Sequence, residues 1–214
     1  SKYKPAIKIV LIMLAVASLI IALARPRHGE KEITETRAGI EIMIAVDVSR
    51  SMLASSTDDA KGISRLDRAK FLFNKLINSL ENDKVGLVVF AGNSSLQLPI
   101  TNDFVSAKIY INDLSTSMIN EQGTDIGAAI DMALQGFSSD EDVNRAIILL
   151  TDAEDHEEQA VAVADKARQA GVQVNVIGVG TAKGALIPIG NGSSEFLKDE
   201  TGTPVTTRFN ADAA

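Results

Sequence analysis

Residues 40–51 read IEIMIAVDVSRS, and they give the clearest indication of the fold. The first seven residues are apolar apart from Glu41, which is typical of a strand that is buried on both faces of a parallel sheet. The strand is predicted to end at Asp47, which opens the pattern Asp-x-Ser-x-Ser with Ser49 and Ser51. Because a spacing of two directs side chains to the same side, these polar groups are predicted to lie together at the strand end.

Further apolar runs alternate with helical segments along the rest of the chain. Ser64 and Asp67 form a capping-box pattern at the start of the first helical segment. The other predicted strands are residues 85–90, 146–150 and 172–179, and the predicted helices are residues 64–80, 103–114, 157–170 and one that starts at Asp125. This alternation predicts an α/β fold with a doubly wound, mostly parallel sheet and helices on both faces. Such sheets bind ligands at the carboxyl ends of their strands.

Charge is distributed unevenly along the 214 residues. Residues 1–28 hold five Lys or Arg and no acid. The rest of the chain therefore holds 16 of the 21 basic residues and all 28 acidic residues. A strongly acidic remainder excludes a nucleic-acid surface, since phosphate binding needs clustered Lys and Arg. The hydrophobic content of 45% provides for one substantial domain. Because the chain has no cysteine, disulfides, thiolate zinc sites and cysteine nucleophiles are excluded.

The stretch Ile9–Ala24 reads IVLIMLAVASLIIALA and contains no charge. With residues 5–7 it approaches the roughly 20 apolar residues that cross a bilayer. Residues 1–28 are therefore predicted to be one transmembrane anchor helix with basic flanks. A buried core helix and a secretory signal are the alternatives, and the signal is disfavoured because Arg-Pro-Arg at residues 25–27 replaces a small-residue cleavage site.

The remaining boundaries follow from shifts in composition. Residues 29–38 are predicted to be a charged connector, and residues 39–214 one domain. Within this domain, residues 185–208 combine short apolar runs with Gly-Asn-Gly and Thr-Gly turns, which predicts a hairpin excursion. A closing helix and a closing strand of the sheet are expected beyond the hairpin and are missing from the sequence.

The candidate metal ligands stand where predicted strands end. Hard cations take oxygen ligands, so carboxylates and hydroxyls on strand-end loops can converge on one octahedral Mg²⁺, with Mn²⁺ and Ca²⁺ as alternatives. A second strand ends in Thr-Asp at residues 151–152, and Gly-Thr-Asp at residues 123–125 adds a third loop whose threonine hydroxyl can point inward. The predicted metal ligands are Asp47, Ser49, Ser51, Thr124 and Asp152.

Simpler structural roles are open for the same residues. The Asp-x-Ser-x-Ser residues fit a polar turn in which Ser51 caps the next segment. Thr124 fits the N-cap of the following helix, and Asp125 fits a charge in its first turn. We favour the metal site because three separate loops each supply oxygen ligands. His156, close to the site in sequence, is expected on an exposed loop.

The order Asp-x-Ser-x-Ser, Thr and Asp in separate loops resembles the metal-ion-dependent adhesion site (MIDAS) of von Willebrand factor A (VWA) domains. The resemblance implies the Rossmann-like VWA fold over about residues 39–182. In that family the two Ser and the Thr commonly contact the metal, and the Asp residues act directly or through water. These roles are thereby implied for Ser49, Ser51, Thr124, Asp47 and Asp152.

A more specific resemblance covers nearly the whole chain. A span directly before the domain, NDKVGLVVFAG at residues 82–92, QGT at residues 122–124 and the late hairpin resemble the membrane-anchored VWA proteins of the bacterial Bat aerotolerance group. This resemblance implies the bacterial inner membrane, with membrane lipid around the anchor and the domain on the periplasmic side. It also implies as partners other membrane or envelope proteins, including other Bat proteins and a MoxR-type AAA+ ATPase, in oxygen or stress tolerance.

The residues favour binding of a partner over catalysis. If neutral hydroxyls supply most direct contacts, Mg²⁺ keeps much of its charge and an open position for a Glu or Asp of the partner. Neither His28 nor His156 has a recognisable companion for general-base catalysis, so no enzyme activity is predicted. The alternatives are a Mg²⁺-dependent phosphate-ester hydrolase, which generally needs a second carboxylate where Ser49 stands, and an integrin-like surface adhesin.

Overall fold

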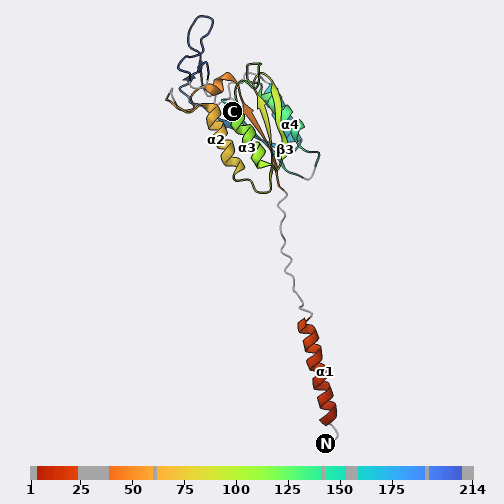
Figure 1. Ribbon diagram of the computed structural model, residues 1–214. Coiled ribbons are helices and arrows are strands. Elements are labelled where there is room, and N and C mark those ends of the chain that lie inside the picture. Colours follow the sequence, from red (N-terminus) through yellow and green to blue (C-terminus); the bar gives the residue numbers. More distant parts are fainter. Residues whose placement is uncertain are drawn as a thin grey trace. The chain divides into compact units, whose positions relative to one another are not determined.

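The computed structural model describes residues 4–23, 39–59, 62–140, 143–152, 159–190 and 193–208 (Figure 1). The chain divides into two units, Ser1–Thr36 and Arg37–Ala214. The first unit contains one described helix, and the second contains every strand that the described residues form.

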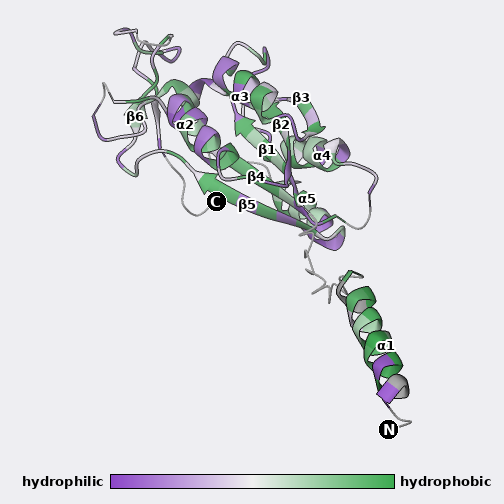
Figure 2. Ribbon diagram, turned by 60° about the horizontal axis from the view of Figure 1, so that its bottom comes forward, coloured by the Kyte–Doolittle hydropathy of each residue, from purple (hydrophilic) through white to green (hydrophobic). Residues whose placement is uncertain are grey.

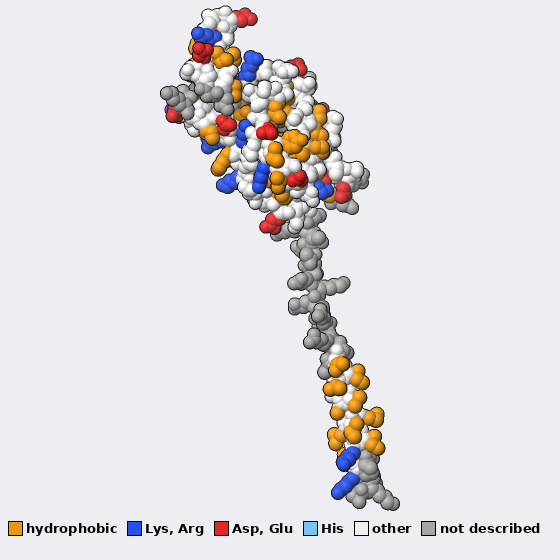
Figure 3. All heavy atoms as spheres, viewed as in Figure 1, with side chains coloured by type: hydrophobic (Ala, Val, Ile, Leu, Met, Phe, Trp, Pro, Cys, Tyr) orange, Lys and Arg blue, Asp and Glu red, His pale blue; other side chains and the backbone are white. Residues whose placement is uncertain are grey.

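The helix of the first unit is α1, Lys4–Leu23. The large apolar side chains described in this helix are exposed, and Lys4 and Lys8 place two charges in its first five residues (Figure 3). Within the described ranges, no helix is both long enough and apolar enough to span a membrane. The segment is helical as predicted, but the transmembrane helix is not confirmed.

A five-stranded sheet forms the centre of the second unit. Its strands are β1 (Glu41–Asp47), β2 (Lys84–Phe90), β3 (Ser94–Thr101), β4 (Arg145–Thr151) and β5 (Val172–Gly178). Their order is β3-β2-β1-β4-β5, with β1 parallel to β2 and β4, and β4 parallel to β5. The predicted mostly parallel α/β sheet is therefore confirmed.

The edge strand β3 was not predicted from the sequence. It pairs with β2 in the antiparallel direction, with two shifts in register. Every residue of β3 is half-buried except the exposed Pro99, and its sequence SSLQLPIT contains no long apolar run. Proline has no N–H for a hydrogen-bond ladder, and an edge strand tolerates this loss.

Helices cover both faces of the sheet. They are α2 (Arg65–Ile77), α3 (Phe104–Asp113), α4 (Ile126–Gly136) and α5 (Gln159–Gln169). On β1, Ile42, Ile44 and Val46 belong to the core cluster with α2 and α3, whereas Met43 and Ala45 belong to the cluster with α4 and α5. Because both faces of β1 are covered, its residues 42–46 are all apolar, as the hydropathy colours show (Figure 2).

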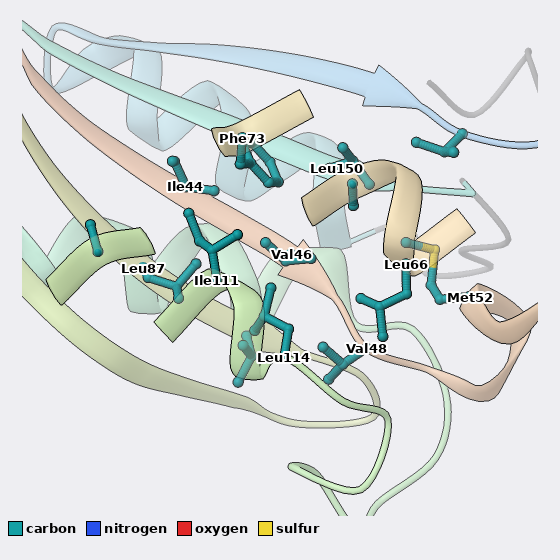
Figure 4. Close-up of a cluster of buried hydrophobic side chains, with 14 of the residues drawn as sticks. Ile44, Val46, Val48, Met52, Leu66, Phe73, Leu87, Ile111, Leu114 and Leu150 are labelled. Carbon is teal, nitrogen blue, oxygen red and sulfur yellow. The ribbon is translucent and has the colours of Figure 1, made fainter. Parts of the chain in front are cut away.

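The core cluster on the α2 and α3 side extends beyond the end of β1 (Figure 4). Ile44, Phe73 of α2 and Ile111 of α3 are buried in it, and burying one such side chain stabilises a fold by roughly 1.5–3 kcal/mol. Val48 and Met52 belong to the same cluster and are fully buried. The loop after β1 is therefore anchored in the core rather than free at the surface.

Side-chain caps fix where the helices begin. The Ser64 hydroxyl accepts a hydrogen bond of 3.0 Å from the Asp67 amide and donates one of 2.7 Å to its carboxylate, at the predicted start of α2. Asp125 is the N-cap of α4, because its carboxylate accepts a hydrogen bond of 2.7 Å from the Ala128 amide. The prediction of Asp125 as a first-turn charge was therefore wrong, and Thr124 is not the N-cap.

Residues 185–190 and 193–208 form a hairpin, called here the hairpin segment. β6 (Ala185–Leu186) pairs with β7 (Thr206–Thr207) in the antiparallel direction. Isolated bridges join Pro188 to Phe196 and Lys198 to Pro204, so the segment folds back more than once. Its pairing is separate from the five-stranded sheet.

Candidate metal centre

The predicted ligands lie where the connections of the sheet change direction. From β1 the chain proceeds to β2 on one side, and it later enters β4 on the other side of β1. Asp47 is the last residue of β1, and Asp152 directly follows β4. Open α/β sheets bind ligands at such a switch point, outside the carboxyl ends of the strands.

Asp47 is fully buried, and its two carboxylate oxygens have different partners. Oδ1 accepts a hydrogen bond of 2.8 Å from the backbone N–H of Ser49, and Oδ2 accepts one of 2.7 Å from the Thr151 hydroxyl. The first bond turns the chain after β1, and the second joins β1 to the end of β4. The carboxylate is therefore held in one orientation at the strand ends.

The hydroxyls of Ser49 and Ser51 lie 2.8 Å apart and hydrogen-bond to each other. Both residues are buried at the start of the short 3₁₀ helix η1 (Arg50–Leu53). The alternative in which Ser51 caps the next segment is wrong, because Ser51 lies within η1 and the N-cap is Ser49. The Ser49 side chain makes no capping hydrogen bond, which leaves its oxygen directed to Ser51.

Asp152 is buried next to this loop and has one oxygen without a partner. Its Oδ2 accepts a hydrogen bond of 2.5 Å from the Arg65 guanidinium. Its Oδ1 is buried and has no hydrogen-bond partner among the described residues. Buried polar atoms are nearly always hydrogen-bonded, so this oxygen fits a site that takes a cation.

The charge of Asp47 is costly in its surroundings. Burial and, next, the nearby Asp152 carboxylate raise the pKa of Asp47 to about 7, although hydrogen bonds from Ser49 and Thr151 lower it. Two carboxylates that share a buried site repel each other, and an intervening cation relieves this repulsion.

Thr124 reaches the same end of the sheet on another loop. The Asp125 amide donates a hydrogen bond of 2.7 Å to the carbonyl of Ala91, which follows β2. Glycines allow the close approach, because a Cβ on Gly92 would lie 2.6 Å from a backbone oxygen of this loop and Gly123 has a φ of 131°. Thr124 is half-buried. Among the described residues no hydrogen bond joins its side chain to the other predicted ligands.

Arg65 and Thr151 contact the candidate ligands and were not predicted from the sequence as parts of the site. Arg65 is the first residue of α2 and fully buried, and a single arginine at a helix start carries no sequence signal for burial. Thr151 could have been found, since it is the first polar residue after the apolar run of β4. His28 and His156 lie outside the described residues.

The chemistry of the donors suits a hard cation. Mg²⁺, Mn²⁺ and Ca²⁺ prefer oxygen ligands from carboxylates and hydroxyls. Across the described ranges, no group of three or more His, Cys, Asp and Glu is arranged to hold a metal. A cation here would therefore depend on two carboxylates, from Asp47 and Asp152, supplemented by neutral hydroxyls.

A doubly wound sheet with a buried Asp-x-Ser-x-Ser loop at its switch point defines the class of protein. The chain belongs to the von Willebrand factor type A domain family, which matches residues 42–154. Within that class it is similar to a crystallised aerotolerance-related membrane protein of Bacteroides fragilis, with 49% identity over 82% of this chain and 84% of that chain and a TM-score of 0.76. BatB of Bacteroides thetaiotaomicron is 46% identical over 82% and 83% of the two chains, also with a TM-score of 0.76. The predicted likeness to Bat VWA proteins is confirmed.

More distant proteins match this chain in sequence or in fold. An uncharacterized protein of Borreliella burgdorferi is 32% identical over 179 residues, which are 80% of this chain and 50% of that protein. This chain spans about half the length of the curated relatives it matches. A mussel byssus matrix protein with a zinc-occupied MIDAS motif shares the fold, at 23% identity over 67% of this chain and 37% of that chain and a TM-score of 0.57.

Proposed function

We propose that this chain is a metal-dependent protein-interaction module that takes a Glu or Asp side chain of a partner protein. The ligands of its divalent cation, most simply Mg²⁺, are Asp47, Ser49, Ser51, Thr124 and Asp152. The observation that carries this proposal is the buried Oδ1 of Asp152, which has no partner among the described residues and belongs to the carboxylate that repels Asp47.

The charges around the site favour an acidic partner. Asp47 and Asp152 formally neutralise a dication, and the guanidinium of Arg65, bonded to Asp152, adds one positive charge. The serine and threonine hydroxyls add oxygen ligands without charge. A bound Mg²⁺ would supply positive charge and an open coordination position. The filled site is then electropositive on a domain that is otherwise acidic, so it attracts a carboxylate.

We propose binding rather than catalysis for this site. A phosphate-ester hydrolase of this type of sheet generally needs a second carboxylate at the position that Ser49 occupies. The Ser49 hydroxyl is hydrogen-bonded to Ser51 and does not replace a carboxylate as general acid–base. The hydroxyls therefore support a role as neutral ligands.

We further propose that α1 attaches the chain to a bacterial inner membrane, with the domain on the periplasmic side. The exposed apolar side chains of α1 support this, and the long stems of Lys4 and Lys8 allow their charges to reach lipid headgroups. The Bacteroides fragilis relative is described as an aerotolerance-related membrane protein. Partners would be other envelope proteins, including other Bat proteins and a MoxR-type AAA+ ATPase, in oxygen or stress tolerance.

Co-purification of envelope proteins with the full chain tests the proposal. Wild type in Mg²⁺ should recover partners, whereas wild type in EDTA and Asp47→Ala in Mg²⁺ should not. Asp131→Ala is the matched control, because Asp131 forms an exposed ion pair with Lys166, and such pairs contribute little. Equal recovery in every arm would show that this site is not the adhesive surface.

A further inference from the structure

We propose that Arg65 is a positioning residue through which the metal site and the hairpin segment stabilise each other. This inference rests on the proposed metal site and adds a second element of the domain to it. The observation behind it is one buried guanidinium that is shared between Asp152 and Thr207.

The guanidinium of Arg65 joins three segments that are distant in sequence. Its Nη1 donates to Asp152 Oδ2 at 2.5 Å and to the Thr207 hydroxyl at 2.8 Å. Its Nη2 donates to the carbonyl oxygen of Thr207 at 3.2 Å. Arg65 and Asp152 are 0% exposed and Thr207 is 1% exposed, so water does not compete for these bonds.

The position of Arg65 in α2 makes it dependent on these partners. As the first residue of the helix, it lies at the end that carries a partial positive charge, which does not favour a cation. Its backbone N–H donates to the carbonyl of Ala54 at 2.9 Å, which fixes the helix start to the end of η1. The compensation for its buried charge therefore comes from Asp152 and from the two oxygens of Thr207.

The hairpin segment has few other buried anchors. Among its described residues, only Ile187 and Thr207 are buried. Ile187 belongs to neither described core cluster of the domain, and Thr207 supplies the polar contact to Arg65. The seating of β7 against the domain thus depends on the orientation of the Arg65 side chain.

Asp152 transmits this dependence to the metal site. Its Oδ2 is used by Arg65, and its Oδ1 is the oxygen available for a cation. When the site is filled, the carboxylate is held at both oxygens and its repulsion with Asp47 is relieved. A fixed Asp152 fixes Arg65, and Arg65 fixes Thr207. Such coupling is reciprocal, so the contact of the hairpin segment must tighten metal binding by the same factor.

The test compares Thr207→Val with Thr206→Val in the full chain, purified in detergent. Both substitutions replace a hydroxyl by a methyl group on β7, but Thr206 is exposed. Mn²⁺ affinity is measured by calorimetry, and hydrogen exchange is measured at the amides of Leu197 and Val205, which are bonded within the hairpin segment. In wild type, Mn²⁺ should slow this exchange. Thr207→Val should bind Mn²⁺ about fivefold more weakly, as for one hydrogen bond, and lose the slowing, while Thr206→Val behaves as wild type.

Two results overturn the inference in different ways. If wild type binds Mn²⁺ without any change in exchange of the hairpin segment, the coupling is absent while the proposed metal site stands. The same holds if both valine variants bind Mn²⁺ as tightly as wild type. If wild type itself binds neither Mn²⁺ nor Mg²⁺, the proposed function fails, and the coupling fails with it.

Discussion

The hydroxyl of Thr151 donates a hydrogen bond of 2.7 Å to Oδ2 of Asp47, across 104 residues of sequence. The parallel register pairs Val46 with Leu150, so the last residues of β1 and β4 meet at the same end of the sheet. The orientation of the Asp47 carboxylate is therefore set by the pairing of two strands and not by its own loop alone.

Replacing Thr151 by valine should weaken metal binding while leaving the fold intact. The valine keeps the shape of the side chain but removes the donor to Asp47. Because a hydrogen bond to a charged group contributes about 1.5 kcal/mol, we expect Mg²⁺ or Mn²⁺ affinity to fall about tenfold in a calorimetric titration. Thr181→Val is the control, since the buried Thr181 hydroxyl has no hydrogen-bond partner in the described part of the chain. Equal metal affinities for the two variants would show that Thr151 does not support the metal site.

The metal-free domain should lose stability as the pH rises from about 5 to 8. The pKa of Asp47 is raised to about 7 in the folded state, so the folded chain holds a proton that the unfolded chain has released. This contribution is fully present below the ordinary pKa of an aspartate, about 3.9, and is lost as the pH rises through the folded value. Melting curves in EDTA across this pH range measure the effect.

Asp47→Asn is the control for this pH dependence, because it removes the titrating group and keeps an oxygen acceptor. The melting temperature of the variant should change less between pH 5 and 8 than that of wild type. In wild type, the increase in melting temperature caused by Mg²⁺ should be larger at pH 8 than at pH 6, since the cation competes with the proton. If the melting temperatures of wild type and variant depended on pH in the same way, this result would contradict the raised pKa of Asp47.

Thr124 and its neighbour Asp125 should separate metal binding from helix stability. Thr124→Val removes a candidate ligand, so metal affinity should fall with little change in metal-free melting. Asp125→Ala removes the N-cap of α4 and should cost about 1 kcal/mol of stability, with a smaller effect on the metal. Urea unfolding in EDTA and calorimetric titration distinguish the two. Loss of metal-free stability in Thr124→Val alone would reverse the assignment.

Deletion of residues 1–28 should release the domain from membranes. The full chain is expected to remain in the membrane pellet after carbonate extraction. The reason is that the exposed apolar side chains of α1 are more stable in lipid than in water. The truncated chain should be soluble and keep the Mg²⁺-dependent rise in melting temperature. Recovery of the full chain in the carbonate supernatant would contradict membrane attachment through α1.

The strands and their polar ends could be predicted because the signals are local. β1, β2 and β4 are buried apolar runs, and Asp47 and Asp152 stand directly where such runs end. Residues with the same local pattern are brought together by the parallel topology, which fixes the end of the sheet at which they meet.

Other features could not be predicted because they depend on distant partners. The burial of Arg65 requires Asp152 and Thr207, which follow it by 87 and 142 residues. The strand β3 is half-buried and contains a proline, so its pairing with β2 compensates for a weak local pattern. The carboxylate of Asp125, rather than the Thr124 hydroxyl, caps α4, because the helix begins at Ile126 and Asp125 stands directly before it.

The edge formed by β3 is a poor template for strands from neighbouring copies. Long, flat and regular edge strands recruit strands from neighbouring copies and can seed fibrils. Exposed Pro99 offers no N–H to such an incoming strand, and the two register shifts distort the regular pattern that templated addition requires. Continuous addition of strands along this edge is therefore disfavoured when copies are crowded together in solution.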